Sequence, residues 1–199
     1  MPIRARYRVS AAFVAATIAL GANAQDDSLP AEGQASLPNV AVDSVDLERY
    51  AGKWYEQARL PQRFQEKCVG DVTAEYALNP DGTIAVTNRC RAEDGSFDES
   101  DAVARRVDGS TSMLEVRFAP AWLGWLPMVW GDYWVIDLDP EYRWAMVGAP
   151  DADYLWILSR EPRLDEDVVQ RLLDRADAMG YPVEDVIRTR QTSGGDGQG

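Results

Sequence analysis

Hydrophobic and polar residues alternate along much of the chain, and this alternation predicts a series of short strands. Within residues 69–78, the apolar residues Val72, Ala74, Tyr76 and Leu78 are each separated by one other residue, mostly a polar one. A period of two indicates a strand with one buried face. The turn-forming sequence Asn-Pro-Asp-Gly follows directly, so this strand is expected to lead into a hairpin.

Seven other segments have the same character and are separated by short turns. The predicted strands are 53–60, 69–78, 83–91, 97–107, 113–118, 132–138, 142–148 and 154–159. An antiparallel sheet of this size usually closes on itself, because closure removes its exposed edges. We therefore predict an all-β fold, an eight-stranded antiparallel up-and-down β-barrel.

One segment after the strands has a helical period instead. Asp165 can cap a helix and Gly180 can end it. The apolar positions between them form one stripe: Val168, Val169, Leu172, Leu173, Ala176 and Met179. We predict one C-terminal α-helix packed on the outside of the barrel, with a membrane or partner helix as the alternative. Residues 183–188 are expected to add a short final strand.

The N-terminus has the features of a secretory signal peptide. Arg4, Arg6 and Arg8 precede an apolar run over residues 9–21, and an Ala-Asn-Ala sequence ends at Ala24. The run is shorter than the ~20 residues that span a bilayer, which argues against a membrane anchor. We expect cleavage after Ala24 and an exported, soluble protein that is periplasmic or secreted.

The rest of the chain divides by composition. Residues 25–43 are rich in Pro, Gly, Ser and acidic residues, which is typical of a flexible spacer, and the Gly-rich C-terminus reads as disordered. The expected organisation is a signal peptide (1–24), a spacer (25–43), one barrel domain (44–191) and a disordered tail (192–199).

The charge and the missing histidine exclude several classes of function. The chain has 20 basic and 33 acidic residues, so it should be repelled by nucleic acid. It contains no histidine, which removes the Ser-His-Asp triad, histidine-ligated haem and most zinc sites. We expect no metal and no cofactor. Cys68 and Cys90 are the two cysteines, and in an exported chain they are expected to form a disulfide, with two buried thiols as the alternative.

Three ordered motifs resemble those of the lipocalins, in particular the bacterial outer-membrane and apolipoprotein D-like group. Gly52 and Trp54 stand in a G-x-W-Y motif, Asp139 and Tyr142 resemble the second motif, and Arg160 ends a strand like the third. The resemblance extends over essentially the whole expected domain. It implies that Trp54 closes the narrow end of the barrel, with Arg160 across its ring face.

An eight-stranded barrel has room for one small ligand, which alternate side chains would contact. Residues that match the pocket of the apolipoprotein D-like relatives are Tyr76, Asn88, Tyr133 and Trp156. Alternation adds Val86, Val135, Trp144 and Met146, and Phe64 is placed in the first connection at the mouth. The alternative is that these side chains fill a solid core.

The sequence departs from the resemblance in three places. Bacterial relatives often begin with a lipidated cysteine, and none occurs near Ala24. Asp137 replaces a small residue, which would add a carboxylate to the barrel interior. The connection 121–130 is unusually apolar and contains Trp122 and Trp125, which would lie at the entrance rim. It could also contact a lipid interface, form a homodimer interface or pack over the barrel.

The resemblance implies a protein that binds, carries or stores a small hydrophobic ligand, such as a fatty acid or lysophospholipid, in the cell envelope. No catalytic residues are expected. Two other classes of function stay open. One is a lipid- or isoprenoid-modifying calycin-like enzyme, which would use a free thiol or a carboxylate such as Glu56 or Asp137. The other is an interaction module that uses the Trp-rich connection.

Overall fold

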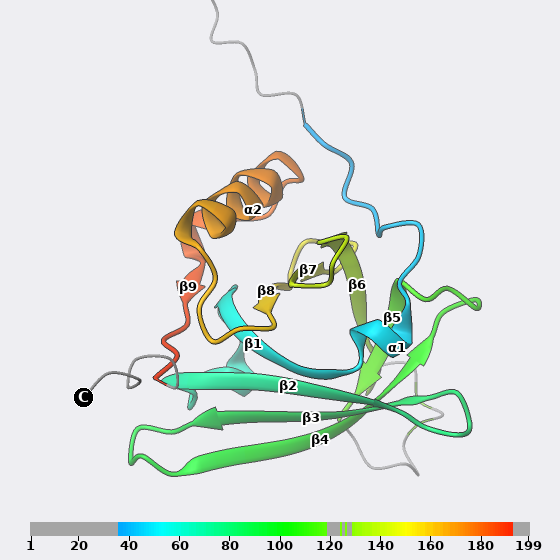
Figure 1. The fold of residues 1–199 in the computed structure, drawn as a ribbon, viewed down its shortest axis with the longest axis horizontal. Helices are drawn as coiled ribbons and strands as arrows, with labels where there is room; N and C mark the ends of the chain where they lie inside the picture. The colour runs from blue at the N-terminus through cyan, green and yellow to red at the C-terminus, as the bar shows by residue number, and fades with distance from the viewer. Residues whose placement is uncertain (1–35, 119–123, 125, 127–128, 193–199) are drawn as a thin grey trace, which may run out of the picture. The chain divides into compact units, whose positions relative to one another are not determined.

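The computed structural model describes residues 36–118, 124, 126 and 129–192, which form a closed β-barrel with a helix beside it (Figure 1). The expected signal peptide, most of the expected spacer, Trp122 and Trp125, and residues 193–199 lie outside the described residues.

The barrel consists of eight strands that each pair with the next in antiparallel fashion, and β8 and β2 both pair with β1. The strands are β1 (Gly52–Arg59), β2 (Gly70–Leu78), β3 (Ile84–Arg91), β4 (Phe97–Arg106), β5 (Met113–Arg117), β6 (Gly131–Leu138), β7 (Trp144–Gly148) and β8 (Leu155–Ser159). The predicted barrel is confirmed, and each predicted strand end lies within two residues of the observed one.

The β2–β3 hairpin shows why the turns fall where they do. The Asp81 carboxylate accepts hydrogen bonds from the backbone N–H of Thr83 (2.9 Å) and from its hydroxyl (2.6 Å). Gly82 has a φ of +83°, which a side chain would disfavour. The local sequence therefore fixes the reversal of the chain.

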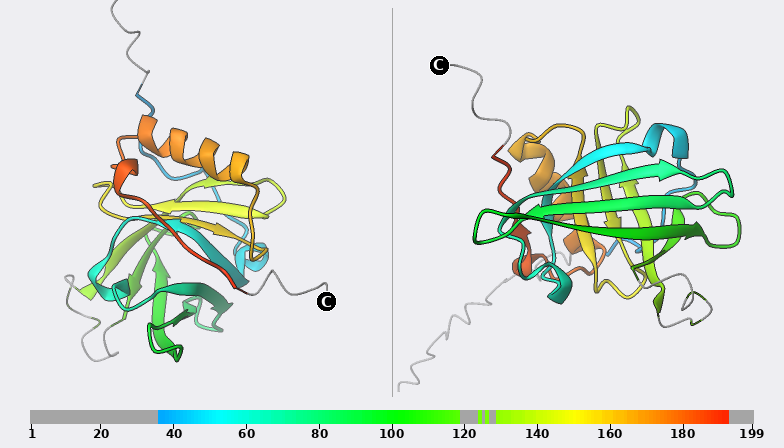
Figure 2. Two further views of the ribbon diagram at one scale, coloured as in Figure 1. Left: turned by 90° about the vertical axis from the view of Figure 1, so that its left-hand side faces the viewer. Right: turned by 90° about the horizontal axis from the view of Figure 1, so that it is seen from below.

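The C-terminal helix α2 (Glu166–Ala178) lies over β7 and β8, outside the barrel (Figure 2). Its residues Val169, Leu172 and Ala176 are buried against Met146 and Ile157 of those strands. The predicted helix and its packing are confirmed, and Gly180 follows it with a φ of +92°. Asp165 occupies the N-cap position, but its side chain makes no capping hydrogen bond.

Short elements complete the fold. They are α1 (Leu47–Tyr50) before β1, the 3₁₀ helix η1 (Arg63–Gln65) between β1 and β2, the 3₁₀ helix η4 (Val183–Asp185), and β9 (Ile187–Arg188), which pairs with β1. The expected final strand is therefore only two residues long.

The C-terminal segment completes the wall between β1 and β2. These strands pair only from Gly52–Tyr76 to Tyr55–Thr73. Beyond that point, the Gln191 side-chain amide donates to the carbonyls of Glu56 (2.8 Å) and Val72 (2.9 Å). The segment therefore bridges the gap where the two strands separate.

The segment before α1 is also joined to the domain. The Leu37 N–H donates to the carbonyl of Ala178 (2.7 Å), and the Val42 N–H donates to that of Val135 (2.8 Å). Among the described residues, contacts with the domain thus reach back to Leu37, before the boundary at residue 44 expected from composition.

Candidate ligand-binding site

One end of the barrel is closed by Trp54 and Arg160. The Trp54 ring is fully buried, and its indole N–H donates to the carbonyl of Tyr50 (2.8 Å). The Arg160 guanidinium carbon lies 3.9 Å from the ring centroid, and its nitrogens donate to the carbonyls of Lys53 (2.9 Å) and Ala51 (3.0 Å). A cation that lies on the face of an indole ring in this way stabilises the fold by about 1–2 kcal/mol. The structure thus brings together the pair that the lipocalin resemblance implied.

The other motif residues support the same end. Gly52 enters β1 with a φ of +90°, a conformation that favours glycine. The Tyr142 hydroxyl accepts a hydrogen bond from the Asp46 N–H (2.8 Å). Arg143 donates to both oxygens of the buried Asp139 carboxylate (2.8 and 2.9 Å), and these bonds lower the pKa of Asp139. These residues have structural rather than ligand-facing positions.

The opposite end of the barrel opens into a cavity of about 360 Å³. This volume falls within the range of small-ligand pockets, roughly 300–1,000 Å³. The cavity reaches the connections after β1 and β5, so these lie at the open mouth. Six of the residues expected to contact ligand line it: Phe64, Tyr76, Val86, Asn88, Tyr133 and Trp156. The interior is therefore not filled along its whole length.

Hydrogen bonds join three tyrosines at the inner end of the barrel, and two of them line the cavity. The Tyr133 hydroxyl lies 2.8 Å from the hydroxyls of both Tyr50 and Tyr76. Tyr76 and Tyr133 line the cavity, while Tyr50 packs on the Trp54 ring with centroids 4.9 Å apart. Burial raises the pKa of Tyr76 to about 12, and it raises those of Tyr50 and Tyr133 well above the usual value. All three phenols are therefore neutral near pH 7.

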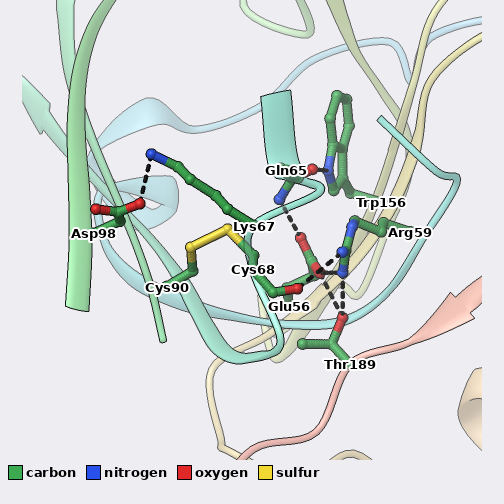
Figure 3. Close-up of a disulfide and its surroundings, with 9 residues drawn as sticks. All are labelled: Glu56, Arg59, Gln65, Lys67, Cys68, Cys90, Asp98, Trp156 and Thr189. Atoms are coloured by element: carbon green, nitrogen blue, oxygen red, sulfur yellow. Dashed lines mark hydrogen bonds and ion pairs between the residues drawn. A yellow bond between two sulfur atoms is a disulfide. The ribbon is translucent and has the colours of Figure 1, made fainter. Parts of the chain in front are cut away.

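A buried ionic network forms part of the wall (Figure 3). The Glu56 carboxylate accepts from the Arg59 guanidinium (2.8 Å) and from the Gln65 amide (3.0 Å). The Gln65 side-chain oxygen accepts from the Trp156 indole N–H (3.1 Å), and the Thr189 hydroxyl donates to Glu56 (2.5 Å). The network links η1, β1, β8 and the C-terminal segment. Sequence reasoning did not assign it to the site; the signal was a carboxylate two residues after Trp54, on the same face of β1.

The mouth carries the disulfide and an ion pair next to it. Cys68 and Cys90 are bonded, with Cα atoms 5.5 Å apart, which confirms the predicted disulfide. Both line the cavity, and Lys67 lies 2.6 Å from the Asp98 carboxylate across the same region (Figure 3). The disulfide holds the first connection, including η1, to the end of β3.

Apolar side chains surround the opening. Phe64 and Phe118 are both about half exposed, and their ring centroids are 6.1 Å apart. Trp130 also lines the cavity, with the Arg105 guanidinium 3.9 Å from its ring centroid. The described part of the Trp-rich connection thus lies at the mouth; the expected rim residues Trp122 and Trp125 lie outside the described residues.

Three residues expected to contact ligand do not line the cavity. Trp144 and Met146 face α2, because the inward side chains of β7 are Ala145 and Val147. Val135 faces inward but is buried in the packed part of the interior.

Asp137 does not add a carboxylate to the interior either. The register between β6 and β7 shifts between Val135 and Asp137, and the Asp137 carboxylate lies 2.9 Å from Arg175 of α2. This irregularity in β6 turns the side chain toward the helix.

A closed antiparallel barrel with a cavity at one end defines a class of protein that holds small ligands inside its wall. A sequence profile described as a lipocalin-like domain matches residues 45–191. The chain therefore belongs to the lipocalin family, whose members bind small hydrophobic ligands.

The relatives agree with this assignment. Temperature-induced lipocalin-1 of Arabidopsis thaliana is 40% identical over 153 residues, covering 76% of this chain and 82% of that protein. Outer membrane lipoprotein Blc of Escherichia coli (strain K12) is 40% identical over 152 residues, covering 75% and 81%.

Among solved structures, insecticyanin from the tobacco hornworm Manduca sexta has a TM-score of 0.58 at 20% identity, covering 76% of this chain and 84% of that one. Apocrustacyanin C1 also has a TM-score of 0.58, at 15% identity, covering 75% and 81%. At these identities the structures show a shared fold.

Proposed function

We propose that this protein binds a single-chain lipid, such as a fatty acid or lysophospholipid, and carries or stores it in the cell envelope. The observation that carries the proposal is the cavity of about 360 Å³, which is open at one end and closed by Trp54 at the other. Val86, Val116 and Leu158 give it an apolar wall. Each methylene of an acyl chain buried there contributes about 0.8 kcal/mol, so no special chemistry is required for tight binding.

We place the role in binding rather than catalysis. An enzyme of the thiol type needs a free cysteine, and both cysteines of the chain are joined in the disulfide. The Glu56 carboxylate already accepts hydrogen bonds from Arg59, Gln65 and Thr189. These bonds suit a structural part of the wall better than a general base.

The envelope location rests on two features. The N-terminal sequence has the pattern of a signal peptide, and the disulfide suits an oxidising compartment. Two relatives point the same way, because Blc is named as an outer membrane lipoprotein in Escherichia coli and Citrobacter freundii. Within the residues that the structure describes, no helix is long and apolar enough to cross a membrane.

The proposal can be tested with a variant that fills the cavity and leaves the outer surface of the barrel unchanged. Val116→Trp places a large ring in the cavity, and we expect it to weaken the binding of a fluorescent fatty acid at least tenfold, because the acyl chain loses its space. Glu115→Trp is the matched control, since its side chain lies on the outer face of the same strand and its ion pair with Arg105 is partly exposed. Fluorescence titration measures both. Equal affinities for the two variants would show that the lipid binds elsewhere.

A further inference from the structure

The three hydrogen-bonded hydroxyl groups at the inner end of the cavity have one donor proton more than the hydrogen bonds between them require. Tyr50, Tyr133 and Tyr76 each carry one hydroxyl proton, and this chain of hydroxyls contains two hydrogen bonds. Whichever way the bonds run, one of the three protons has no acceptor among the described residues. A buried donor without an acceptor is costly, so such groups in proteins are usually satisfied.

This spare donor can be turned into the cavity. If Tyr50 donates to Tyr133 and Tyr133 to Tyr76, the free proton is on Tyr76, which lines the cavity. If the chain runs the other way, Tyr76 instead presents a free lone pair there. The inner end can therefore donate to a ligand oxygen or accept from a ligand hydroxyl.

The surroundings favour a neutral ligand group at this end. The ionic groups that line the cavity belong to the half nearer the mouth: Glu56, Lys67, Arg89, Asp98, Glu99 and Asp132. The inner end is instead packed with apolar side chains such as Trp54 and Leu114. An ionised group would lose its hydration there, and the Arg160 cation behind Trp54 already donates to the carbonyls of Lys53 and Ala51. A hydroxyl or carbonyl needs only a hydrogen bond.

The mouth offers a second polar region. Asn88 and Ser100 are direct partners across β3 and β4, both line the cavity, and neither side chain hydrogen-bonds to another described residue. The Lys67–Asp98 ion pair lies beside them. The cavity is thus polar at both ends, with an apolar wall of Val86, Val116 and Leu158.

We propose that the cavity selects a ligand that is polar at both ends, with a neutral hydroxyl or carbonyl at its inner end, as in an acyl chain with an ω-hydroxyl, aldehyde or ketone group. The ligand's inner oxygen pairs with Tyr76 or Tyr133, and its charged head group stays at the mouth. This inference rests on the proposed function and names the ligand class more closely.

The test compares a series of saturated fatty acids with their ω-hydroxy counterparts by calorimetric titration, below the concentrations at which they aggregate. At the chain length that reaches the tyrosines, we expect the ω-hydroxy acid to bind the natural protein about tenfold more tightly, the effect of one added hydrogen bond. The double variant Tyr76→Phe/Tyr133→Phe keeps the ring shapes and removes both cavity-lining hydroxyls, so the preference should reverse.

Tyr50→Phe is the matched control. It shortens the chain but leaves Tyr133 and Tyr76 with one bond and two protons, so the preference for the ω-hydroxy acid should persist. Tighter binding of the plain acid by the natural protein at every length would overturn the inference and leave the proposed function standing. Binding of neither series would instead overturn the proposed function.

Discussion

Trp54 shows how a single side chain can define one end of a ligand site without touching the ligand. Its ring is covered on one face by Arg160 and lies beside the Tyr50 ring, and neither Trp54 nor Tyr50 lines the cavity. The same Tyr50 hydroxyl begins the chain that reaches Tyr133 and Tyr76. At the residue scale, Tyr50 therefore takes part both in the packing of the closed end, through its ring, and in the polar inner end of the cavity, through its hydroxyl.

Trp54→Ala should therefore reduce stability rather than ligand selectivity. Truncating a large buried ring costs roughly 3–5 kcal/mol, and here it also leaves the Arg160 cation without its aromatic contact. Urea unfolding measures the loss. Trp144→Ala, at the half-buried first residue of β7, should cost clearly less. A Trp54 variant that unfolds normally but no longer binds lipid would place this residue in the ligand site.

At the scale of elements, the strand boundaries were predictable from the sequence, whereas the facing of some strands was not. β2 alternates apolar and polar residues, so the inward position of Tyr76 follows from the pattern. β7 reads Trp-Ala-Met-Val-Gly and is buried on both faces, because α2 covers its outer side. Because both faces carry apolar residues, the sequence pattern does not show which face of β7 points into the barrel. The prediction that the larger residues, Trp144 and Met146, point inward was wrong.

The position of Asp137 and the Glu56 network were not predicted, because both depend on contacts that the local sequence pattern does not show. The irregularity that turns Asp137 toward α2 leaves no mark in the sequence. The Glu56 network includes Thr189, more than a hundred positions away, so the local pattern could show the buried carboxylate but not its full set of partners. The disulfide was predictable, because the chain has only two cysteines and they flank one predicted hairpin.

The disulfide fastens the connection that carries η1, and its removal should have a measurable cost. Cys68 and Cys90 are 22 residues apart, and a loop of this size stabilises the folded state by about 3 kcal/mol. Cys68→Ser/Cys90→Ser should lower the free energy of unfolding by this amount. Reductant should produce the same loss in the natural protein and none in the double variant. Two thiols that alkylate in the unreduced natural protein would contradict the assignment.

At the scale of the whole molecule, the apolar and polar surfaces are unevenly distributed. The chain has a net charge of −13, yet Phe64 and Phe118 are exposed together at the mouth. Exposed apolar clusters on a soluble protein often mark a contact site. We propose that this rim contacts a lipid surface briefly while the ligand passes into the barrel.

Phe64→Ser/Phe118→Ser should slow the uptake of a fluorescent fatty acid from vesicles several-fold, with a nearly unchanged melting temperature. Stopped-flow fluorescence measures the rate, and the same direction is expected for Trp122→Ser/Trp125→Ser. Leu78→Ser is the control, because this exposed residue ends β2 toward the closed end. An unchanged rate in both double variants would limit these side chains to packing.

The bridge that Gln191 makes between β1 and β2 also determines when the barrel can be completed. The wall needs β8, which pairs with β1, and then the side chain of Gln191, more than 30 positions after β8. These contacts are among the most distant along the sequence, and such contacts form late because their loop entropy must be lost first. While the chain is being synthesised, β1 to β7 can form their hairpins, but the cavity has no continuous wall until Gln191 is available. A ligand can therefore be enclosed only after the chain has been synthesised as far as this residue.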